Sequence, residues 1–477
     1  MNCGAMGQKL MKRAVAAGVT VVACIVFPFA SPLSAREGSA ETPLSTEEKL
    51  YGLSLIWKEA SYNFAYFERV PDLKWDEMYQ KFIPKVMAAG TTVEYYNLLM
   101  QFCAQLHDGH TRIFPPEECR DYYDKPNVLV LNIHRQAIIT AVGESLKHDI
   151  PVGSRVIEVD GIAADEYLRT GLFPRICAST EDFLWEVGIL DLLKGQKGTN
   201  VAIKCLTPAG KTLEIRLKRN SSDLDEPRVN TYPRTSKRFE FTHLDKDIAY
   251  VALNSFADTG IVSDFERILP ALRGSKGIII DLRRNGGGES DVGYAILKYL
   301  IDKPAVTFKW KTREHCAAYK AWGRWTSEFP PEELANLDEK RKEYLKHYRG
   351  AAWLEGESDT IYPASQADRM SPVVVLIGPL TASAAEDFLV ALSSTEHACI
   401  IGRRSAGFTG TPLIFDLPGD GMALINTTRE MFPDGVEIRN GIRPDIEIES
   451  NIQDIIDGKD VALQRARSFL KDMPLIK

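Results

Sequence analysis

The chain contains 477 residues, enough for about three domains of ordinary size. Its hydrophobic content of 44% and charged content of 26% are typical of a globular protein and exclude a largely disordered one. The formal net charge of -7 argues against a broad basic face for nucleic acid, so no nucleic-acid partner is expected.

Residues 1–35 have the layout of a secretory signal peptide. Basic residues precede an apolar stretch at 14–30, and a small-residue segment ending at Ala35 predicts cleavage there. Pro28 and the shortness of the apolar core argue against a membrane anchor, because a span needs about 20 apolar residues. Cys24 loosely fits a lipoprotein cleavage site, an alternative that the apolar residues after it disfavour. We expect an exported protein, periplasmic or extracellular, with no membrane span in the mature chain.

Removal of residues 1–35 leaves six cysteines, whose pairing stays open. No CxxC spacing occurs, so neither a zinc knuckle nor a redox pair is indicated. Export permits disulfides, but buried free thiols are equally compatible with a chain of this size. The six are Cys103, Cys119, Cys177, Cys205, Cys316 and Cys399.

Residues 36–125 are predicted to form an N-terminal helical domain. Ser45 with Glu48, and Thr91 with Glu94, are capping-box patterns that begin helices. Apolar residues then recur at spacings of three and four, which places them on one helical face and indicates a core rather than a cofactor site. The two stripes are Leu50, Leu53, Trp57 and Ala60, and Tyr96, Leu99, Cys103 and Leu106.

Residues 126–222 change to short β-type runs, with Asp160-Gly161 as a tight-turn signal between two strands. The segment 153–161 resembles the PDZ pattern, and 194–199 resembles a later turn of that fold. This resemblance implies a PDZ-like domain, which captures an extended peptide as an added strand. The alternative is a plain β-domain without a ligand. The predicted strands lie at 128–131, 137–139, 155–159 and 201–203.

Residues 223–477 are predicted to form an α/β core, because strand-like runs alternate with helical segments. Two continuous apolar runs, at 278–280 and 373–377, end at turn residues as buried strands do.

An insertion is predicted at about 313–352, between these two strands, because the segment is charged and helix-rich. It carries Trp322, Trp325 and Phe329. Such an insertion is expected beside the carboxyl ends of the strands, where its aromatic side chains would cover a bound peptide. The alternative is a surface hairpin whose aromatic side chains pack on the core.

His110 stands in the segment Leu106-His107-Asp108-Gly109-His110-Thr111, directly after the last helical stripe. A histidine can accept the proton of a serine near neutral pH, so His110 is a candidate base. The alternatives are a structural histidine and a metal pair with His107. No HExxH pattern or carboxylate cluster completes such a pair, so no metal is expected.

Three glycines, Gly286, Gly287 and Gly288, follow the strand at 278–280. The Gly-Lys-Ser/Thr ending of a phosphate-binding loop is missing. The stronger interpretation is an oxyanion hole, whose N–H donors face the oxygen that gains charge during acyl transfer. The alternative is a flexible turn.

Ser383 stands in the segment Leu380-Thr381-Ala382-Ser383-Ala384-Ala385-Glu386, directly after the strand at 373–377. A serine at a strand-to-helix turn is well placed as a nucleophile, because the turn exposes its hydroxyl and the helix N-terminus supplies free N–H groups. The alternative is that Ser383 only caps the helix.

Together, and in this order, the three segments resemble the S41 family of serine peptidases, the C-terminal-processing and tricorn-type proteases. The resemblance covers most of the chain after residue 35 and implies an α/β core of the ClpP/crotonase-like type. It implies Ser383 as the nucleophile and the amides of Gly287 and Ala384 as the oxyanion hole. Gly286 and Gly288 compete with Gly287 for that role.

One position separates the two branches of that family. The processing branch uses a lysine about two dozen residues after the serine, where this sequence has Phe408. A phenyl ring accepts no proton and neighbouring guanidinium groups stay charged, so a Ser-Lys dyad is not available. The sequence instead resembles the tricorn-like branch, in which His110 is the base and a downstream glutamate, here Glu437, supports the site. Gly109 stands where some relatives carry a second polar helper.

We therefore expect an exported, multi-domain α/β serine peptidase that cleaves protein or peptide substrates through an acyl-enzyme on Ser383. His110 shuttles the proton, Glu437 supports the site, and no metal, nucleotide or other cofactor is expected. The alternative is a catalytically silent protein of the same fold that binds a peptide or a lipophilic ligand. Cleavage preference and oligomeric state stay open.

Overall fold

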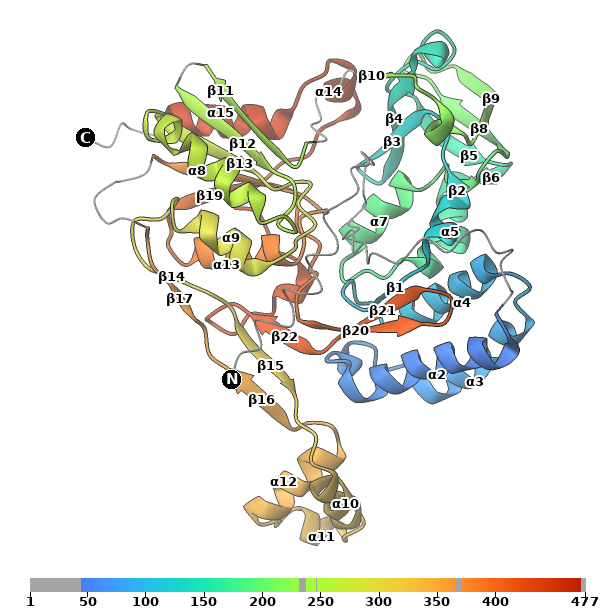
Figure 1. The fold of residues 1–477 in the computed structure, drawn as a ribbon, viewed down its shortest axis with the longest axis vertical. Helices are drawn as coiled ribbons and strands as arrows, with labels where there is room; N and C mark the ends of the chain where they lie inside the picture. The colour runs from blue at the N-terminus through green and yellow to red at the C-terminus, as the bar shows by residue number, and fades with distance from the viewer. Residues whose placement is uncertain (1–43, 231–236, 246, 365–370, 473–477) are drawn as a thin grey trace.

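The computed structural model describes residues 44–230, 237–245, 247–364 and 371–472. The expected signal peptide lies outside these residues. Within them the chain has a mixed α/β architecture, with N-terminal helices, a β-rich module, a sheet flanked by helices, and an arm that projects from the body (Figure 1). No helix of these ranges has the length and apolar character needed to cross a membrane.

Three helices form the N-terminal part, namely α2 (Thr46–Asn63), α3 (Trp75–Ala88) and α4 (Thr92–Ala104). The predicted capping box of Ser45 begins α2, and the Thr91 hydroxyl caps α4 by accepting from the backbone N–H of Glu94 at 3.1 Å. The apolar faces of the three helices pack into one buried cluster, as the spacing of their apolar residues predicts.

This helical core is completed by a hairpin from the far end of the chain. β20 (Pro412–Leu417) pairs with β21 (Gly421–Asn426), and β1 (Arg112–Phe114) pairs with the other edge of β21. Apolar residues of the hairpin lie in the same buried cluster as those of the helices. The segment that carries His110, between α4 and β1, therefore lies between the N-terminal helices and the β20–β21 hairpin.

The β-rich module follows α5 (Glu117–Asp121) and contains the four predicted strands. The turn at Asp160-Gly161 has positive φ values of 48° and 80°, as its sequence predicts. The elements are β2 (Tyr123–Asp124), β3 (Val128–Ile133), β4 (Gln136–Gly143), β5 (Arg155–Val159), β6 (Ile162–Ala163), α6 (Ala164–Tyr167), α7 (Glu181–Leu190), β7 (Gly195–Gln196), β8 (Asn200–Leu206), β9 (Thr212–Lys218) and β10 (Arg228–Asn230). The main sheet runs β10-β4-β5-β8-β9, with β3 paired to β4, and α7 packs against β3 (Figure 1).

The core of the remaining chain is a six-stranded sheet in the order β11-β12-β13-β18-β19-β23. β11 is antiparallel to β12, and the other neighbours are parallel. Helices α8, α9 and α13 pack on one face and α15 on the other. The elements are β11 (Phe239–Leu244), β12 (Ile248–Leu253), α8 (Gly260–Arg273), β13 (Gly277–Asp281), α9 (Ser290–Leu297), β18 (Val373–Ile377), α13 (Ala384–Ser393), β19 (Ala398–Gly402), β23 (Ile446–Glu447), α14 (Ile452–Ile456) and α15 (Val461–Asp472).

The two strands predicted to be buried, β13 and β18, are direct parallel neighbours in this sheet. Parallel neighbours end at the same edge, so the glycine segment 286–288 and the turn that carries Ser383 leave the sheet side by side.

The insertion forms an arm rather than a cover over the sheet. Its ribbon and helices are β14 (Ala305–Val306), β15 (Lys309–Arg313), α10 (Ala317–Thr326), α11 (Pro331–Leu334), α12 (Glu339–Tyr348), β16 (Trp353–Gly356) and β17 (Thr360–Ile361). β15 pairs with β16 and with β22 (Thr428–Met431), and this ribbon carries the three helices away from the six-stranded sheet (Figure 1).

The placement expected for the insertion, beside the carboxyl ends of the strands, is therefore wrong. The alternative, aromatic side chains packed on the core, is also wrong, because the Trp322 ring lies 4.9 Å from that of Tyr344 within the arm and Trp325 is 65% exposed. The physical reason is that β15 continues outward as an extended ribbon instead of turning back over the sheet.

Candidate active site

The turn between β18 and α13 positions Ser383. Ser383 lies at the N-cap of α13 with φ 58° and ψ -129°, a backbone conformation that residues other than glycine rarely adopt. The Thr381 hydroxyl holds the turn, since it donates to the Leu282 carbonyl at 2.8 Å and accepts from the Gly378 N–H at 3.0 Å. The half-buried Ser383 is thus presented at the positive end of a helix, where its sequence position predicts it.

Gly287 lies directly against Ser383. A Cβ at Gly287 would be 2.6 Å from Ser383 Cβ and 2.9 Å from the carbonyl oxygen of Ala382, so no side chain fits there. Its φ of 100° likewise requires glycine. The glycine segment therefore forms one wall of the space around the candidate nucleophile.

The backbone N–H groups around Ser383 differ in whether they are already engaged. Those of Ala384, Gly286 and Gly288 make no hydrogen bond within the ranges that the structure describes. The Gly287 N–H instead donates to Asn285 Oδ1 at 2.9 Å. The unengaged groups are the ones that can turn toward a charged oxygen, so the geometry favours Gly286 or Gly288 over Gly287 as the partner of Ala384.

His110 is buried, and one nitrogen of its ring is fixed. Nδ1 lies 2.8 Å from the carbonyl oxygen of Gly410, which can only accept a hydrogen bond, so Nδ1 carries the proton and Nε2 the lone pair. Burial lowers the pKa of His110 below its ordinary value of 6.5, while the nearby Asp108 carboxylate acts in the opposite direction. The lowered pKa favours the neutral imidazole, which in this tautomer carries its lone pair on Nε2.

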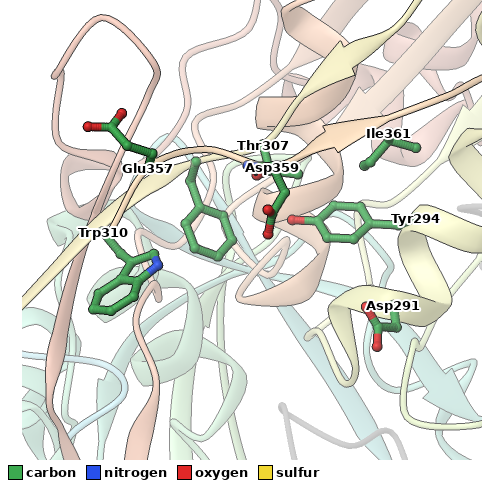
Figure 2. Close-up of a pocket in the computed structure, with 8 residues that line it drawn as sticks. Asp291, Tyr294, Thr307, Trp310, Glu357, Asp359 and Ile361 are labelled. Atoms are coloured by element: carbon green, nitrogen blue, oxygen red, sulfur yellow. Dashed lines mark hydrogen bonds between the residues drawn. The ribbon is translucent and has the colours of Figure 1, made fainter. Parts of the chain in front are cut away.

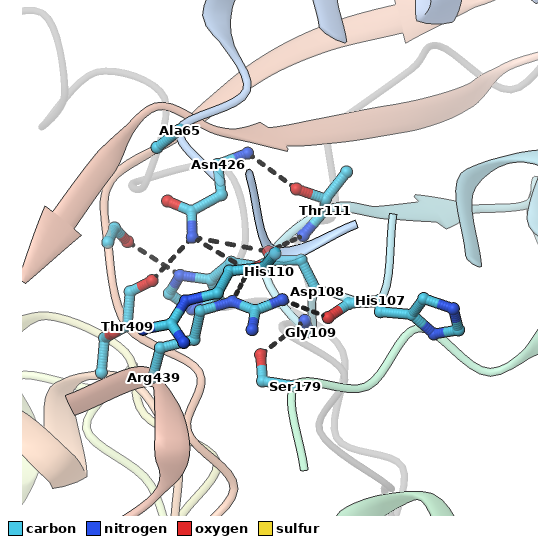
Figure 3. Close-up of polar contacts among 12 residues, drawn as sticks. Ala65, His107, Asp108, Gly109, His110, Thr111, Ser179, Thr409, Asn426 and Arg439 are labelled. Atoms are coloured by element: carbon cyan, nitrogen blue, oxygen red, sulfur yellow. Dashed lines mark hydrogen bonds and ion pairs between the residues drawn. The ribbon is translucent and has the colours of Figure 1, made fainter. Parts of the chain in front are cut away.

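A network of polar contacts fixes the segment around His110 (Figure 3). Asp108, which is 1% exposed, accepts from the Thr111 N–H at 2.9 Å and pairs with Arg439 at 3.4 Å. Arg439 also donates to the His107 carbonyl, and the Asn426 amide donates to the Thr409 carbonyl at 2.8 Å. Asp108 and Arg439 are site residues that the sequence reasoning did not identify.

The position of Asp108 inside the same motif as His110 was a usable signal. Arg439 gave no such signal, because its contact with Asp108 joins segments 331 residues apart.

Glu386 links Ser383 to the loop that follows β19. Its buried carboxylate accepts from the backbone N–H groups of Ser383 at 3.0 Å, Gly407 at 2.8 Å and Phe408 at 2.8 Å, and from the Ser405 hydroxyl at 2.5 Å. Burial raises the pKa of Glu386 to about 7, although these hydrogen bonds favour the charged form. The Ser-x-x-Glu spacing from Ser383 is a capping-box signal that could have identified this residue.

The loop 405–410 connects the two candidate catalytic residues. Glu386 holds its first half beside Ser383, and the Gly410 carbonyl holds His110 at its end. Among the described residues no hydrogen bond joins His110 to Ser383 itself. The structure therefore places both residues beside the same loop, with no hydrogen bond between them among the described residues.

Phe408 fills the space beside these residues. Its buried ring packs in a cluster with Ala382 and Phe183, and its centroid lies 6.1 Å from that of His110. A Cβ at Gly109 would overlap this ring. The missing side chain at position 109 and the phenyl ring at position 408 are thus complementary in space.

Glu437 has different neighbours from those expected of a supporting acid. Its carboxylate pairs with Arg69 and, at 3.5 Å, with Arg429. No described contact joins it to Ser383 or His110, so its role stays a prediction.

Two further buried carboxyl groups lie near the site. Asp387, one helical turn after Ser383, accepts from the Ser290 hydroxyl at 2.5 Å, and burial raises its pKa to about 7. Burial and the neighbouring Asp387 charge also raise the pKa of Glu430. In the ranges that the structure describes, no three His, Cys, Asp or Glu side chains come together as ligands of one metal ion.

A cavity of about 480 Å³ separates the β-rich module from the carboxyl edge of the six-stranded sheet. Its walls include Leu131 and Ile133 of β3, Glu186 of α7, and residues 378–380, which lead into the Ser383 turn. An extended chain lying there would approach the candidate nucleophile between the two parts of the molecule.

A smaller cavity of about 260 Å³ lies where α9 meets the base of the arm (Figure 2). Figure 2 shows Asp291 and Tyr294 of α9 across from Trp310 and Asp359. Carboxylates beside aromatic rings provide the chemistry that binds a positively charged group.

Comparison with known proteins gives consistent matches. Residues 247–448 match the sequence profile of peptidase family S41. The carboxyl-terminal-processing protease of Picosynechococcus sp. is 21% identical over 360 residues, which cover 73% of this chain and 71% of that protein. The chloroplastic C-terminal processing peptidase of Tetradesmus obliquus is 21% identical over 367 residues, 75% of this chain and 68% of that protein.

Among solved structures, mature CPAF superimposes with a TM-score of 0.67 at 16% identity. The superposition covers 90% of this chain and 99% of that one. The two chains therefore share a multi-domain α/β fold.

Proposed function

We propose that Ser383 is the nucleophile and His110 the base of this chain, a serine-type peptidase of family S41. The observation that carries the proposal is the loop 405–410. It contacts the Ser383 turn through Glu386, and its Gly410 carbonyl favours the His110 tautomer that carries the lone pair on Nε2.

The proposed reaction is acyl transfer to Ser383. Its Oγ attacks the peptide carbonyl while His110 Nε2 takes the hydroxyl proton, which it then donates to the departing amine. The carbonyl oxygen, now negative, accepts from the Ala384 N–H and from Gly286 or Gly288, and water later releases the acyl group. Catalytic hydrogen bonds are often long without substrate, so we infer that the His110–Ser383 bond forms in the substrate complex.

The supporting acid needs a separate test. Glu437 is the candidate from the sequence, and Asp108 is the buried carboxylate whose charge acts on His110. If Glu437 supports the base, Glu437→Gln should lower kcat in a folded protein. If Asp108 has that role instead, Asp108→Asn should lower kcat while Glu437→Gln leaves it unchanged.

We also propose that the β-rich module is PDZ-like and presents peptides to a ClpP/crotonase-like core. Within the described residues β3 pairs on one side only, with β4, and α7 packs next to it, which is the arrangement that adds a peptide as a further strand. The cavity between β3 and the residues ahead of Ser383 supports this path. Protein or peptide chains are the proposed substrates.

The second candidate function is a silent binding protein of the same fold, favoured by the missing contact between His110 and Ser383. A fluorophosphonate probe distinguishes the two, because it forms a covalent bond only with an activated serine. We expect labelling that disappears in Ser383→Ala and persists in Ser393→Ala, which alters an exposed serine at the end of the same helix. No labelling of the folded wild-type protein would support the binding protein.

Export is the remaining part of the proposal. We expect the protein recovered from the periplasm or medium to begin after Ala35, as its N-terminal peptide read by mass spectrometry would show. A lipid-modified N-terminus at Cys24 would replace this cleavage site with the lipoprotein alternative.

A further inference from the structure

Two thiols from separate parts of the chain meet in the N-terminal core. Cys103 lies in α4 and is 1% exposed, and Cys177 follows a short 3-10 helix, η4 (Phe173–Arg175), and is 5% exposed. Both are free thiols in the structure and belong to the same buried cluster, where Cys177 is the neighbour that acts most on the pKa of Cys103. α4 and η4 also pack together, with Arg175 donating to Asn97 Oδ1 at 3.2 Å.

Each cysteine lies just ahead of a segment that contacts the candidate active site. Cys103 is followed by the turn that leads from α4 to His110, in which its carbonyl accepts from the Leu106 N–H at 3.1 Å. Cys177 is followed by Ser179, whose hydroxyl accepts from the Gly109 N–H at 3.0 Å.

The second segment reaches the loop beside Ser383 as well. Thr180 donates to the Ala406 carbonyl at 3.1 Å, within the loop 405–410 that Glu386 and His110 share. The stretch from Cys177 to Thr180 therefore contacts both the His110 segment and the loop next to the nucleophile.

We propose that Cys103 and Cys177 form a disulfide that clamps the His110 segment to the residues 177–180. The oxidant is a small-molecule disulfide such as oxidised glutathione. One cysteine thiolate attacks it and releases one glutathione thiol, and the second cysteine thiolate displaces the other from the mixed disulfide. The two cysteine S–H bonds and one glutathione S–S bond are exchanged for one protein S–S bond and two glutathione thiols.

The two thiols are neighbours within one buried cluster, which is the starting point for the proposed bond. The bond would close a long loop across the helical part and the β-rich module, the situation in which a disulfide restricts the unfolded chain most. A hydrogen bond with Cys177 and burial raise the pKa of Cys103, so the folded protein holds little thiolate that could attack an oxidant. The bond should therefore form during folding, and the burial of both sulfurs should afterwards keep reductants away from it.

The first test maps the bond in the full chain, refolded in oxidised or in reduced glutathione. Free thiols are alkylated in denaturant, and peptides are separated by mass spectrometry without reduction. We expect a linked Cys103–Cys177 peptide in the oxidised sample only, absent from Cys103→Ser and present in Cys205→Ser, which alters a buried cysteine of another core. A link of either residue to Cys119, which lies in the same cluster, would overturn the proposal, as would two free thiols after oxidation.

The second test asks what the bond does. Oxidised wild-type and Cys205→Ser proteins should unfold several degrees above their reduced forms, and Cys103→Ser should show no difference between the two forms. The effect of the bond on activity rests on the proposed function. The oxidised enzyme should keep hydrolysing a short ester at temperatures where the reduced enzyme has lost activity.

Equal heat inactivation of both forms would overturn the proposal that the disulfide clamps the His110 segment. Absence of hydrolysis in both forms at any temperature would count against the proposed function, while peptide mapping still decides the bond.

Discussion

At the scale of single residues, the candidate site depends on the fit of the Phe408 ring against Gly109 as much as on its polar groups. The Phe408 ring lies over Gly109 and beside His110, in the position where the processing branch of the family is expected to have its base. The ring fits because position 109 has no side chain. If His110 is the base, as proposed, its use coincides with a phenyl ring in the space beside it and no side chain at position 109.

Gly109→Ala should lower kcat about tenfold, because the added methyl group overlaps the Phe408 ring and should displace the His110 segment, and about 1.4 kcal/mol of barrier corresponds to a factor of ten. The measurement is kcat on a short ester, with Gly171→Ala as the control, since a Cβ there meets no neighbour within 4 Å. Adding Phe408→Val should restore part of the loss. A folded Gly109→Ala protein with full kcat would show that the ring does not constrain His110.

The pH dependence of the reaction should follow His110. Its imidazole must be neutral to accept a proton, and burial lowers its pKa, so activity should fall on acidification through a midpoint below 6.5. The measurement is kcat/KM of a short ester from pH 4 to 8, and His110→Ala should lose several orders of magnitude, as Ser383→Ala does. A midpoint above 6.5, or near-full activity in His110→Ala, would assign the base to another group.

The residues found from the sequence are those with local signals. Ser383 and His110 stand in short motifs whose spacing alone indicates their chemistry. Glu386 had a capping-box signal, but its contacts with residues 405–408 depend on the loop after β19 folding back against α13, which no local pattern predicts. Arg439 could not be predicted, since an ion pair between distant segments leaves no local pattern.

At the scale of secondary-structure elements, the site depends on the adjacency of β13 and β18. The sequence predicts both as buried strands but contains nothing that makes them neighbours rather than strands separated by another one. Their parallel pairing brings the glycine segment 286–288 against the Ser383 turn. The bounds of both strands were predictable because their apolar runs end at turn residues. The position of the arm was not, because a charged helical segment contains no signal for the length of the β15–β16 ribbon that carries it.

Gly287→Ala should lower kcat by at least tenfold while the protein stays folded. The methyl group would lie 2.6 Å from Ser383 Cβ, and the positive φ of Gly287 disfavours any side chain. The measurement is kcat together with thermal unfolding, compared with Gly274→Ala, where a Cβ makes only ordinary contacts. Unchanged kcat in a folded variant would mean that this wall does not position the nucleophile.

At the scale of the whole molecule, the proposed peptide path lies between the β-rich module and the core, which ion pairs join. Arg403, at the end of β19, pairs with Glu186 of α7 at 3.1 Å and with Glu449 at 3.5 Å. The Arg403–Glu186 pair joins the core to the β-rich module, and both residues line the larger cavity. It is therefore positioned to set how the module is oriented toward Ser383.

Arg403→Ala should raise KM for long peptides several-fold and leave hydrolysis of short esters nearly unchanged, because short substrates need only Ser383, His110 and the oxyanion hole. The measurement compares kcat and KM on both substrate types, with Arg341→Ala in the arm as the control. An equal loss on long and short substrates would indicate that Arg403 acts on the folding of the core rather than on peptide presentation.

The pairing of β1 with β21 makes the His110 segment depend on the last part of the chain to be synthesised. The histidine segment leaves the ribosome early, but the strand that covers it, the carbonyl that orients its ring and the arginine beside Asp108 all come from the last quarter of the chain. If Ser383 and His110 act as proposed, a nascent chain has no oriented base until this last quarter has been made. A chain truncated before Gly410 should therefore stay inactive on a short ester, although its histidine segment is complete.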